Sequence, residues 1–187
     1  MQINPDEVLE YLSAVDENGL PKCNSDTKLY IGGDSERFRV KGVWHADYIL
    51  VLVVHINGNK GCKIFGEVQR ELDYDQRKDR PVQRLMNEAY KIADVYGRLK
   101  DVIEASGFDV QIHVDLNPDK TAGSSCAIDQ AVGYIQAMTG LEAIPKPKAF
   151  AASYAADRYK EVRAFERRES LGLSKRKFEE MLAHEAA

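Results

Sequence analysis

The sequence has no long apolar run, no N-terminal signal pattern and no paired cysteines. None of its apolar stretches approaches the roughly 20 residues that a helix needs to cross a bilayer. Residues 1–19 lack a basic patch followed by an apolar core, so we expect no secretory signal. Cys23, Cys62 and Cys126 are widely separated and form no C-x-x-C pair. We therefore expect reduced thiols in a cytoplasmic protein, and neither a disulfide framework nor a zinc site.

The chain also lacks an excess of positive charge. It has 26 Lys and Arg residues against 30 Asp and Glu, which gives a formal net charge of −4. This balance argues against a surface devoted as a whole to nucleic acid. An enzyme that acts on nucleic acid is compatible with it, because acidic metal ligands lower the formal charge and bound cations reverse it locally. With 187 residues, of which 44% are apolar, the chain is expected to form one main globular domain.

The first half of the chain predicts a short helix followed by three antiparallel strands. Apolar residues at helical spacing favour a helix over 5–15, and the polar segment 17–27 is expected to be a connector. Strands are expected at about 28–38, 46–56 and 62–72, and an Asn-Gly turn joins the last two. The second of these strands is apolar almost throughout, which is typical of a central strand buried on both faces.

The second half alternates helices and strands. Its patterns predict a long helix over 81–106, a strand over 108–117 and a helix with serine at its N-cap over 124–140. A short strand over 141–147 and two further helices over 149–169 and 173–187 are expected to follow. The resulting order predicts an α/β fold with a mixed five-stranded sheet and helices on both faces. The first three strands would be antiparallel, with the fourth and fifth parallel to the first.

We expect three parts along the chain. Residues 1–27 would form the N-terminal helix and connector, and 28–165 the main domain. Residues 166–187 would form a charged helical extension. The segment 158–177 is locally basic, which is typical of a solvated helix with glutamate–arginine pairs but also of an arm that contacts phosphates.

Four acidic residues stand at unusual places in this pattern. Asp34 follows an apolar strand start and two glycines, and Asp115 ends the fourth strand. If these strands are parallel neighbours, both carboxylates lie at the carboxyl edge of the sheet, where open α/β sheets gather ligands. Glu88 lies beside the apolar face of the long helix, and Asp157 lies among alanines in a later helix.

A site for divalent cations is the common explanation of these acids. Four converging carboxylates would repel one another without cations, and Mg²⁺ prefers oxygen ligands. Two Mg²⁺ or Mn²⁺ ions about 4 Å apart can activate a water molecule and stabilise the leaving oxygen of a phosphodiester. Each acid has a structural alternative: a turn cap for Asp34, an Asx-type loop start for Asp115, and salt bridges for Glu88 and Asp157.

Several segments together resemble the YkuK-type family of ribonuclease H-like proteins. The similar segments, between about residues 28 and 160, are YIGGDS, RLMNEAY, HVDLN, AVGYIQAMTG, IPKPKAFAAS and AADRY. The resemblance implies the ribonuclease H fold. It matches Asp34, Glu88, Asp115 and Asp157 to the family's four acids as catalytic and metal-binding residues. It therefore implies a metal-dependent nuclease that hydrolyses phosphodiester bonds of RNA, DNA or a hybrid.

Further residues are candidates for the mouth of this site. Ser35, Glu36, Asn117 and Lys146 are expected to contact substrate, and Ser124 to line the same mouth. The Asp-x-Glu spacing of Asp34 and Glu36 resembles the first motif of DEDD-type 3′–5′ exonucleases. Those enzymes place a Tyr or His four residues before the last aspartate, where this chain has Ser153.

Other interpretations stay open from the sequence. His113 is either a packed strand histidine or a proton-transfer group. The whole domain is either a nuclease or a catalytically silent module for binding or assembly, because fold alone does not guarantee chemistry. An acidic pocket for a nucleotide is a third hypothesis.

Overall fold

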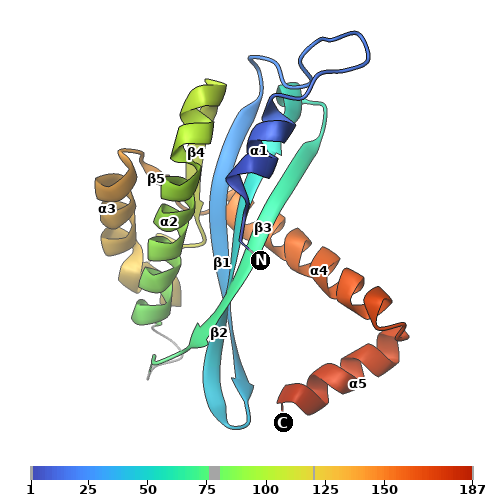
Figure 1. Cartoon of the computed structure of the whole chain (residues 1–187). Helices are drawn as coiled ribbons and strands as arrows, with labels where there is room; N and C mark the ends of the chain where they lie inside the picture. The colour runs from blue at the N-terminus through green and yellow to red at the C-terminus, as the bar shows by residue number, and fades with distance from the viewer. Residues whose placement is uncertain (1, 76–80, 120, 187) are drawn as a thin grey trace.

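The computed structural model describes residues 2–75, 81–119 and 121–186. A mixed five-stranded sheet in the order β3-β2-β1-β4-β5 forms its centre (Figure 1). The strands β1, β2 and β3 form an antiparallel meander, and β4 and β5 run parallel to β1. Their bounds are Lys28–Val40, Val43–His55, Cys62–Leu72, Asp109–Val114 and Ala143–Ile144. The predicted fold class is confirmed.

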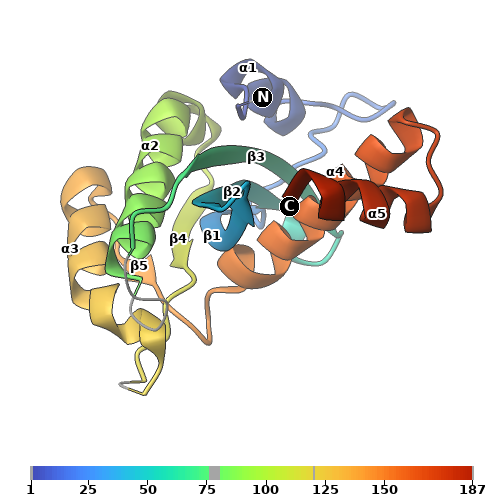
Figure 2. The ribbon, with the colours of Figure 1, turned by 90° about the horizontal axis from the view of Figure 1, so that it is seen from below.

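Helices cover both faces of this sheet. On one face lie α1 (Pro5–Leu12), α2 (Val82–Ser106) and α3 (Ile128–Thr139), and on the other lies α4 (Ala156–Ser170) (Figure 2). The last helix, α5 (Lys175–Ala186), turns back from the end of α4 and contacts β1. Among the described residues, no helix combines the length and the apolarity required to cross a membrane.

The alternation of side chains along the strands builds two apolar layers. Leu50 and Leu52 pack with residues of α2 in the larger layer, and Ile49, Val51 and Val53 pack with alanines of the last helical segment in the smaller one. That segment starts with η3 (Ala151–Ala155), a π-helix. A Cβ atom at Gly32 of β1 would lie only 2.7 Å from the backbone nitrogen of Ala152. The glycine therefore allows the last helical segment to approach the strand closely.

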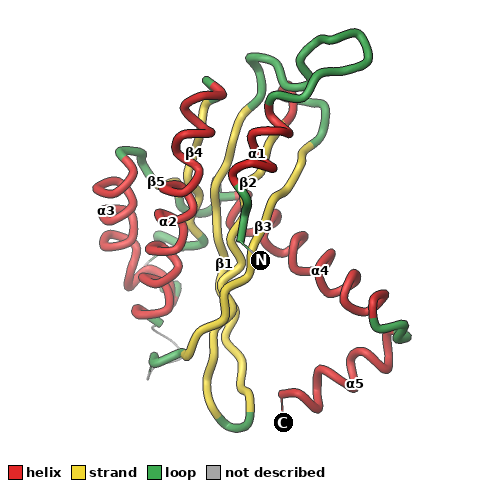
Figure 3. Tube along the Cα trace, viewed as in Figure 1, coloured by secondary structure: helices red, strands yellow, loops and turns green. Residues whose placement is uncertain are grey.

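Two helical predictions need correction. The expected helix over 124–140 begins as a 3-10 turn, η2 (Gly123–Ala127), and α3 follows it without a side-chain N-cap. Ser124 is therefore not the N-cap; its hydroxyl instead accepts a hydrogen bond from the backbone N–H of Asn117. The expected helix over 149–169 opens with the π-helical turn, which lies against Gly32. Figure 3 shows the loop between α1 and β1, where a connector was expected. Between β3 and α2, residues 76–80 lie outside the described residues.

The sheet opens where β4 ends. β4 pairs with β1 only as far as Gly33, opposite Val114, whereas β1 continues to Val40 with β2 as its partner. β3 pairs with β2 only as far as His45, so the β1–β2 hairpin extends beyond β3 (Figure 3). From Asp34 onward, one edge of β1 is therefore free of β4. Three of the four predicted acids meet at this opening.

Candidate active site

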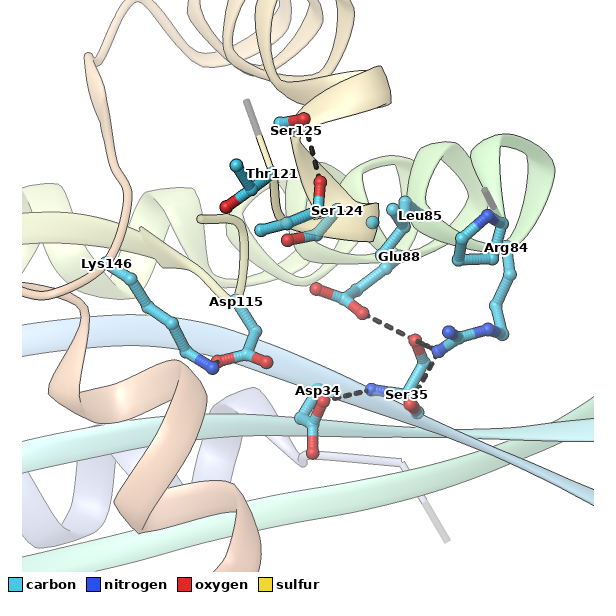
Figure 4. Close-up of a pocket in the computed structure, with 13 residues that line it drawn as sticks. Asp34, Ser35, Arg84, Leu85, Glu88, Asp115, Thr121, Ser124, Ser125 and Lys146 are labelled. Carbon is cyan, nitrogen blue, oxygen red and sulfur yellow. Dashed lines mark hydrogen bonds and ion pairs between the residues drawn. The ribbon is translucent and has the colours of Figure 1, made fainter. Parts of the chain in front are cut away.

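A cavity of about 680 Å³ lies at the point where β4 leaves β1. Three of the four predicted acids line it: Asp34 from β1, Glu88 from α2, and Asp115 directly after β4. The predicted Ser35, Ser124 and Lys146 line it as well, together with Arg84 (Figure 4). Segments distant in sequence thus bring three carboxylates and two cationic side chains to one cavity.

Asp34 and Asp115 lie next to each other at the sheet opening. The last pair of the β1–β4 ladder joins Gly33 to Val114, and each aspartate is the following residue. The backbone N–H of Ser35 donates to Asp34 Oδ1 at 2.7 Å. Burial and then the charge of Asp115 raise the pKa of Asp34 to about 6, although this hydrogen bond acts in the opposite direction. The negative charge of Asp34 is therefore incompletely compensated.

Glu88 projects from α2 into the same cavity and is only 2% exposed. The Ser35 hydroxyl donates to Glu88 Oε2 at 2.6 Å. Arg84 Nη1 in turn donates to the hydroxyl and the carbonyl oxygen of Ser35, both at 2.6 Å. Burial, followed by the charges of Asp34 and Asp115, raises the pKa of Glu88 to about 8 despite the serine hydrogen bond. Near neutral pH this side chain therefore favours a proton or another cation.

Asp115 has partners within the chain. The ammonium group of Lys146 lies 2.8 Å from Asp115 Oδ1, and the Ser153 hydroxyl donates to the same oxygen at 2.7 Å. Burial disfavours the charged lysine, but the hydrogen bond and the charge of Asp115 outweigh it, so the pKa of Lys146 is raised. Lys146 thus places a positive charge on one acid of the cavity.

The donor chemistry of the cavity suits a hard divalent cation. Its acidic donors are carboxylate oxygens, which Mg²⁺ and Mn²⁺ prefer, and two of these groups have raised pKa values. In the described part of the chain, however, no group of three or more His, Cys, Asp or Glu side chains is arranged to hold a metal ion. Serine and lysine contacts engage Glu88 and Asp115 instead. The residues fit the cation by type, and their side chains would have to turn toward it.

The other predicted site residues lie outside the residues that line the cavity. Asp157 is exposed on α4, but its charge contributes to the raised pKa of Asp34. Glu36 is exposed and pairs with Lys160 at 2.8 Å. Asn117 is exposed, and its side chain accepts a hydrogen bond from the Asp119 N–H.

His113 belongs to the core and does not line the cavity. It is 2% exposed and packs between the rings of Tyr30 and Phe150. Its Nδ1 accepts a hydrogen bond from the backbone N–H of Ala151, and burial lowers its pKa to about 4. A neutral, packed histidine matches the structural interpretation of this residue.

Sequence reasoning missed Arg84 and the role of Ser153. Arg84 stands four residues before Glu88, so the two share one face of α2. This spacing is a signal that could have identified Arg84. Ser153 was noted only as a departure from the exonuclease motif, whereas its hydroxyl binds Asp115 across the sheet opening. That contact depends on tertiary packing, which no local pattern reports.

Comparisons with known proteins agree with the architecture. A family model described as ribonuclease H-like matches residues 11–161. A comparison with curated proteins found no match. One similar solved structure is a simian T-cell lymphotropic virus intasome in complex with PP2A regulatory subunit B56 gamma, with 12% identity and a TM-score of 0.36 over 84% of this chain and 46% of the other.

A second similar structure is NurA, with 15% identity and a TM-score of 0.23 over 60% of this chain and 25% of that one. The chain thus spans less than half the length of either structure. These distant likenesses add little to the family match, which covers most of the sequence. The chain belongs to the ribonuclease H-like family.

Proposed function

We propose that this protein is a divalent-metal-dependent nuclease that hydrolyses phosphodiester bonds of nucleic acid. The observation that carries the proposal is the convergence of Asp34, Glu88 and Asp115 in one open cavity, with raised pKa values at two of them. Membership of the ribonuclease H-like family supports it. The narrower YkuK-type assignment belongs to the same proposal.

Each acid has a role in this proposal. Asp34 and Asp115 would hold Mg²⁺ or Mn²⁺ jointly, and Glu88 and Asp157 would each complete one coordination shell. Two such ions supply a nucleophile at neutral pH and stabilise the leaving oxygen. Asp157 would be the outermost ligand, since it is exposed on α4 and lies outside the residues that line the cavity, although its charge acts on Asp34.

The chain's own cations would orient the substrate. Lys146 and Arg84 line the cavity beside the acids. Lys146 now pairs with Asp115, and if Asp115 held a divalent ion, the ammonium group of Lys146 would be available for a phosphate oxygen. Arg84 stays on Ser35, and Ser35 keeps Glu88 in place, so Arg84 and Ser35 act as positioning residues.

The decisive experiment compares the wild type with Asp34→Asn. With Mn²⁺ and a panel of labelled single-stranded, duplex and hybrid substrates, we expect cleavage by the wild type and a loss of about 10³-fold in the variant, because a metal site supplies several kcal/mol of transition-state stabilisation. Mn²⁺ at ten times its dissociation constant should also raise Tm by about 3–5 °C in the wild type only. Cleavage retained by a folded Asp34→Asn protein would refute the proposal.

One observation favours a second candidate, a catalytically silent module for binding or assembly. Lys146 already neutralises Asp115, and within the described residues no group of acids is arranged to hold an ion. This candidate predicts no shift of Tm with Mn²⁺ and no cleavage. The thermal measurement therefore separates the two functions before any substrate is known.

A further inference from the structure

The β1–β2 hairpin carries a cationic and aromatic surface that the proposed chemistry leaves unused. The segment RFRVKGVWH, residues 37–45, contains Arg37, Arg39 and Lys41 but no carboxylate, although the whole chain has a net charge of −4. The same segment contains Phe38 and Trp44. We name residues 37–45 the hairpin tip.

Guanidinium groups stack on the aromatic rings of the tip. The Cζ atom of Arg37 lies 4.1 Å from the ring centroid of Trp44, and that of Arg39 lies 4.7 Å from it. Arg37 is held in place by Asp73, with Nε 2.6 Å from Oδ2, and is largely buried. Arg39 is exposed, and in the part of the chain that the structure describes it forms no ion pair. In the tip, the guanidinium of Arg37 is therefore fixed against Trp44, whereas that of Arg39 is accessible.

The tip and the cavity are parts of one strand. Arg39 lies five residues beyond Asp34 on β1, which corresponds to about 17 Å. β4 ends at the cavity, so the edge of β1 between them has no strand beside it. Arg37 and Arg39 lie two and four residues after Ser35 on β1, so their side chains point to the same face of the sheet, the face of α2. The helix α5 contacts β1 on the other face, the side of α4 (Figures 1 and 2). No strand therefore separates the cavity from the tip along this edge, and Asp75, whose carbonyl oxygen accepts a hydrogen bond from Arg37 Nη2 at 2.8 Å, lies beside it.

We propose that the hairpin tip binds a single-stranded segment of nucleic acid that emerges from the cavity. Arg39 and Lys41 would contact phosphates, and the Trp44–Arg39 stack would receive an unstacked base, since bases stack on both aromatic rings and guanidinium planes. Duplex bases are already stacked and cannot use this platform. The inference rests on the proposed function, because the polymer in the cavity would be the nuclease substrate.

The single tryptophan of the chain gives a direct readout. Trp44 is the only tryptophan in the sequence, so intrinsic tryptophan fluorescence reports on the tip alone. The test uses the Asp34→Asn full chain in EDTA, titrated with a 12-nucleotide oligothymidylate and, separately, with a duplex of the same length. We expect saturable quenching by the single strand and weaker binding of the duplex. Binding measured by anisotropy without a change in Trp44 emission would overturn the inference.

Paired variants test the phosphate contacts. The double variant Arg39→Ala, Lys41→Ala should weaken oligothymidylate binding at least about tenfold and lower the salt slope by about 1.4, which is 0.7 for each lost contact. Lys28 and Lys60 are equally exposed cations toward the opposite end of the meander. The matched control Lys28→Ala, Lys60→Ala removes the same charge and should change affinity less than twofold. Equal losses in the two double variants would overturn the inference.

A conservative pair tests the stack. Trp44→Phe retains a ring and should bind within about threefold of the parent, whereas Trp44→Ala should lose about 5- to 100-fold. A circular dichroism melt identifies any variant that has unfolded. If a folded Trp44→Phe protein loses as much affinity for oligothymidylate as the double variant Arg39→Ala, Lys41→Ala, stacking is contradicted.

The outcomes separate the two proposals. Binding at the tip without cleavage in Mn²⁺ by the wild type would sustain the tip and refute the nuclease. If the tip variants cleave and bind oligothymidylate as the parent protein does, the nuclease proposal stands and the proposal of binding at the tip is refuted.

Discussion

Two buried glutamates of this protein have nearly the same exposure and opposite surroundings. Glu67 of β3 is 1% exposed and Glu88 of α2 is 2% exposed. Glu67 accepts hydrogen bonds from the Ile3 N–H at 2.6 Å, from Arg98 at 2.7 Å and from Gln69 at 2.7 Å. Glu88 accepts one from the Ser35 hydroxyl and shares its cavity with Asp34 and Asp115.

The comparison distinguishes a structural carboxylate from one that is suited to a ligand. The charge of Glu67 meets a guanidinium and a backbone N–H, so its burial connects the N-terminal segment, α2 and β3. Burial, and after it the charges of Asp34 and Asp115, raise the pKa of Glu88. Burial alone therefore does not identify a functional acid; the informative feature is that Glu88 lies beside like charges and, among the described residues, forms no ion pair of its own.

The largest expected effect is that of Glu88→Gln on cleavage. The amide keeps the shape of the side chain and can still accept the Ser35 hydrogen bond, but it loses the negative charge that would hold a cation. We expect cleavage in Mn²⁺ to fall by about 10²- to 10³-fold, while metal-free stability stays equal or rises. Urea unfolding and single-turnover cleavage of the same preparation check both parts. A variant that is unfolded, or fully active, would contradict the contrast.

Glu67→Gln should have the converse effect. The amide places a donor where Glu67 now accepts hydrogen bonds, and it removes the buried one of the two carboxylates that pair with Arg98, leaving the exposed Asp94. We expect the free energy of unfolding to fall by about 2–3 kcal/mol, with cleavage per folded molecule unchanged. Urea denaturation provides the measurement. Lys100→Ala, which removes an exposed ion pair of the same helix, is the control and should change stability by less than about 0.5 kcal/mol.

The smallest expected effect is a pH dependence of metal-free stability. Burial, more than the neighbouring charges, raises the pKa of Glu88 to about 8 from 4.5, so the folded protein binds more protons than the unfolded chain between these values. The free energy of unfolding must then fall as pH rises through this window, by about 2 kcal/mol between pH 6 and pH 8. Asp34 acts with the same sign at lower pH, since its pKa is raised to about 6.

Glu88→Gln isolates the contribution of this side chain to the pH dependence. The variant should be markedly less sensitive to pH from 6 to 8, whereas the Glu67→Gln protein should keep the wild-type slope. Urea titrations in EDTA at several pH values give both slopes. Identical slopes in the wild type and Glu88→Gln would show that another group is responsible.

Much of the fold follows from local patterns. The run of apolar residues in β2 predicted a central strand, and the bounds predicted for β3 agree with the structure. The helical period of α2 gave its extent to within one residue at its start. These elements were predictable because hydrophobic period and turn chemistry act over a few neighbouring residues. The π-helical start of the last helix was not, because it depends on the close approach of Ala152 to Gly32.

The candidate site was predictable in part for the same reason. Asp34 and Asp115 could be placed together because parallel strands bring their carboxyl ends to one edge. Glu88 was marked by its position beside the apolar face of a helix. The contacts of Ser35, Ser153 and Lys146 with these acids come from elements far apart in the chain. No spacing in the sequence reports such distances, so the partners of each acid emerged only from the structure.

The alternation of β1 gives the site a particular origin in folding. Ser35 points toward α2 and Asp34 toward the opposite layer, because their strand partners Tyr48 and Ile49 face opposite sides of the sheet. The charges of Asp34 and Asp115 meet when β4 pairs with β1, and the charge of Glu88 joins them only when α2 docks on the sheet. Where this docking step follows the folding transition state, repulsion of Glu88 by the two aspartates accelerates unfolding more than it slows folding. A bound cation would accordingly lower the rate of unfolding.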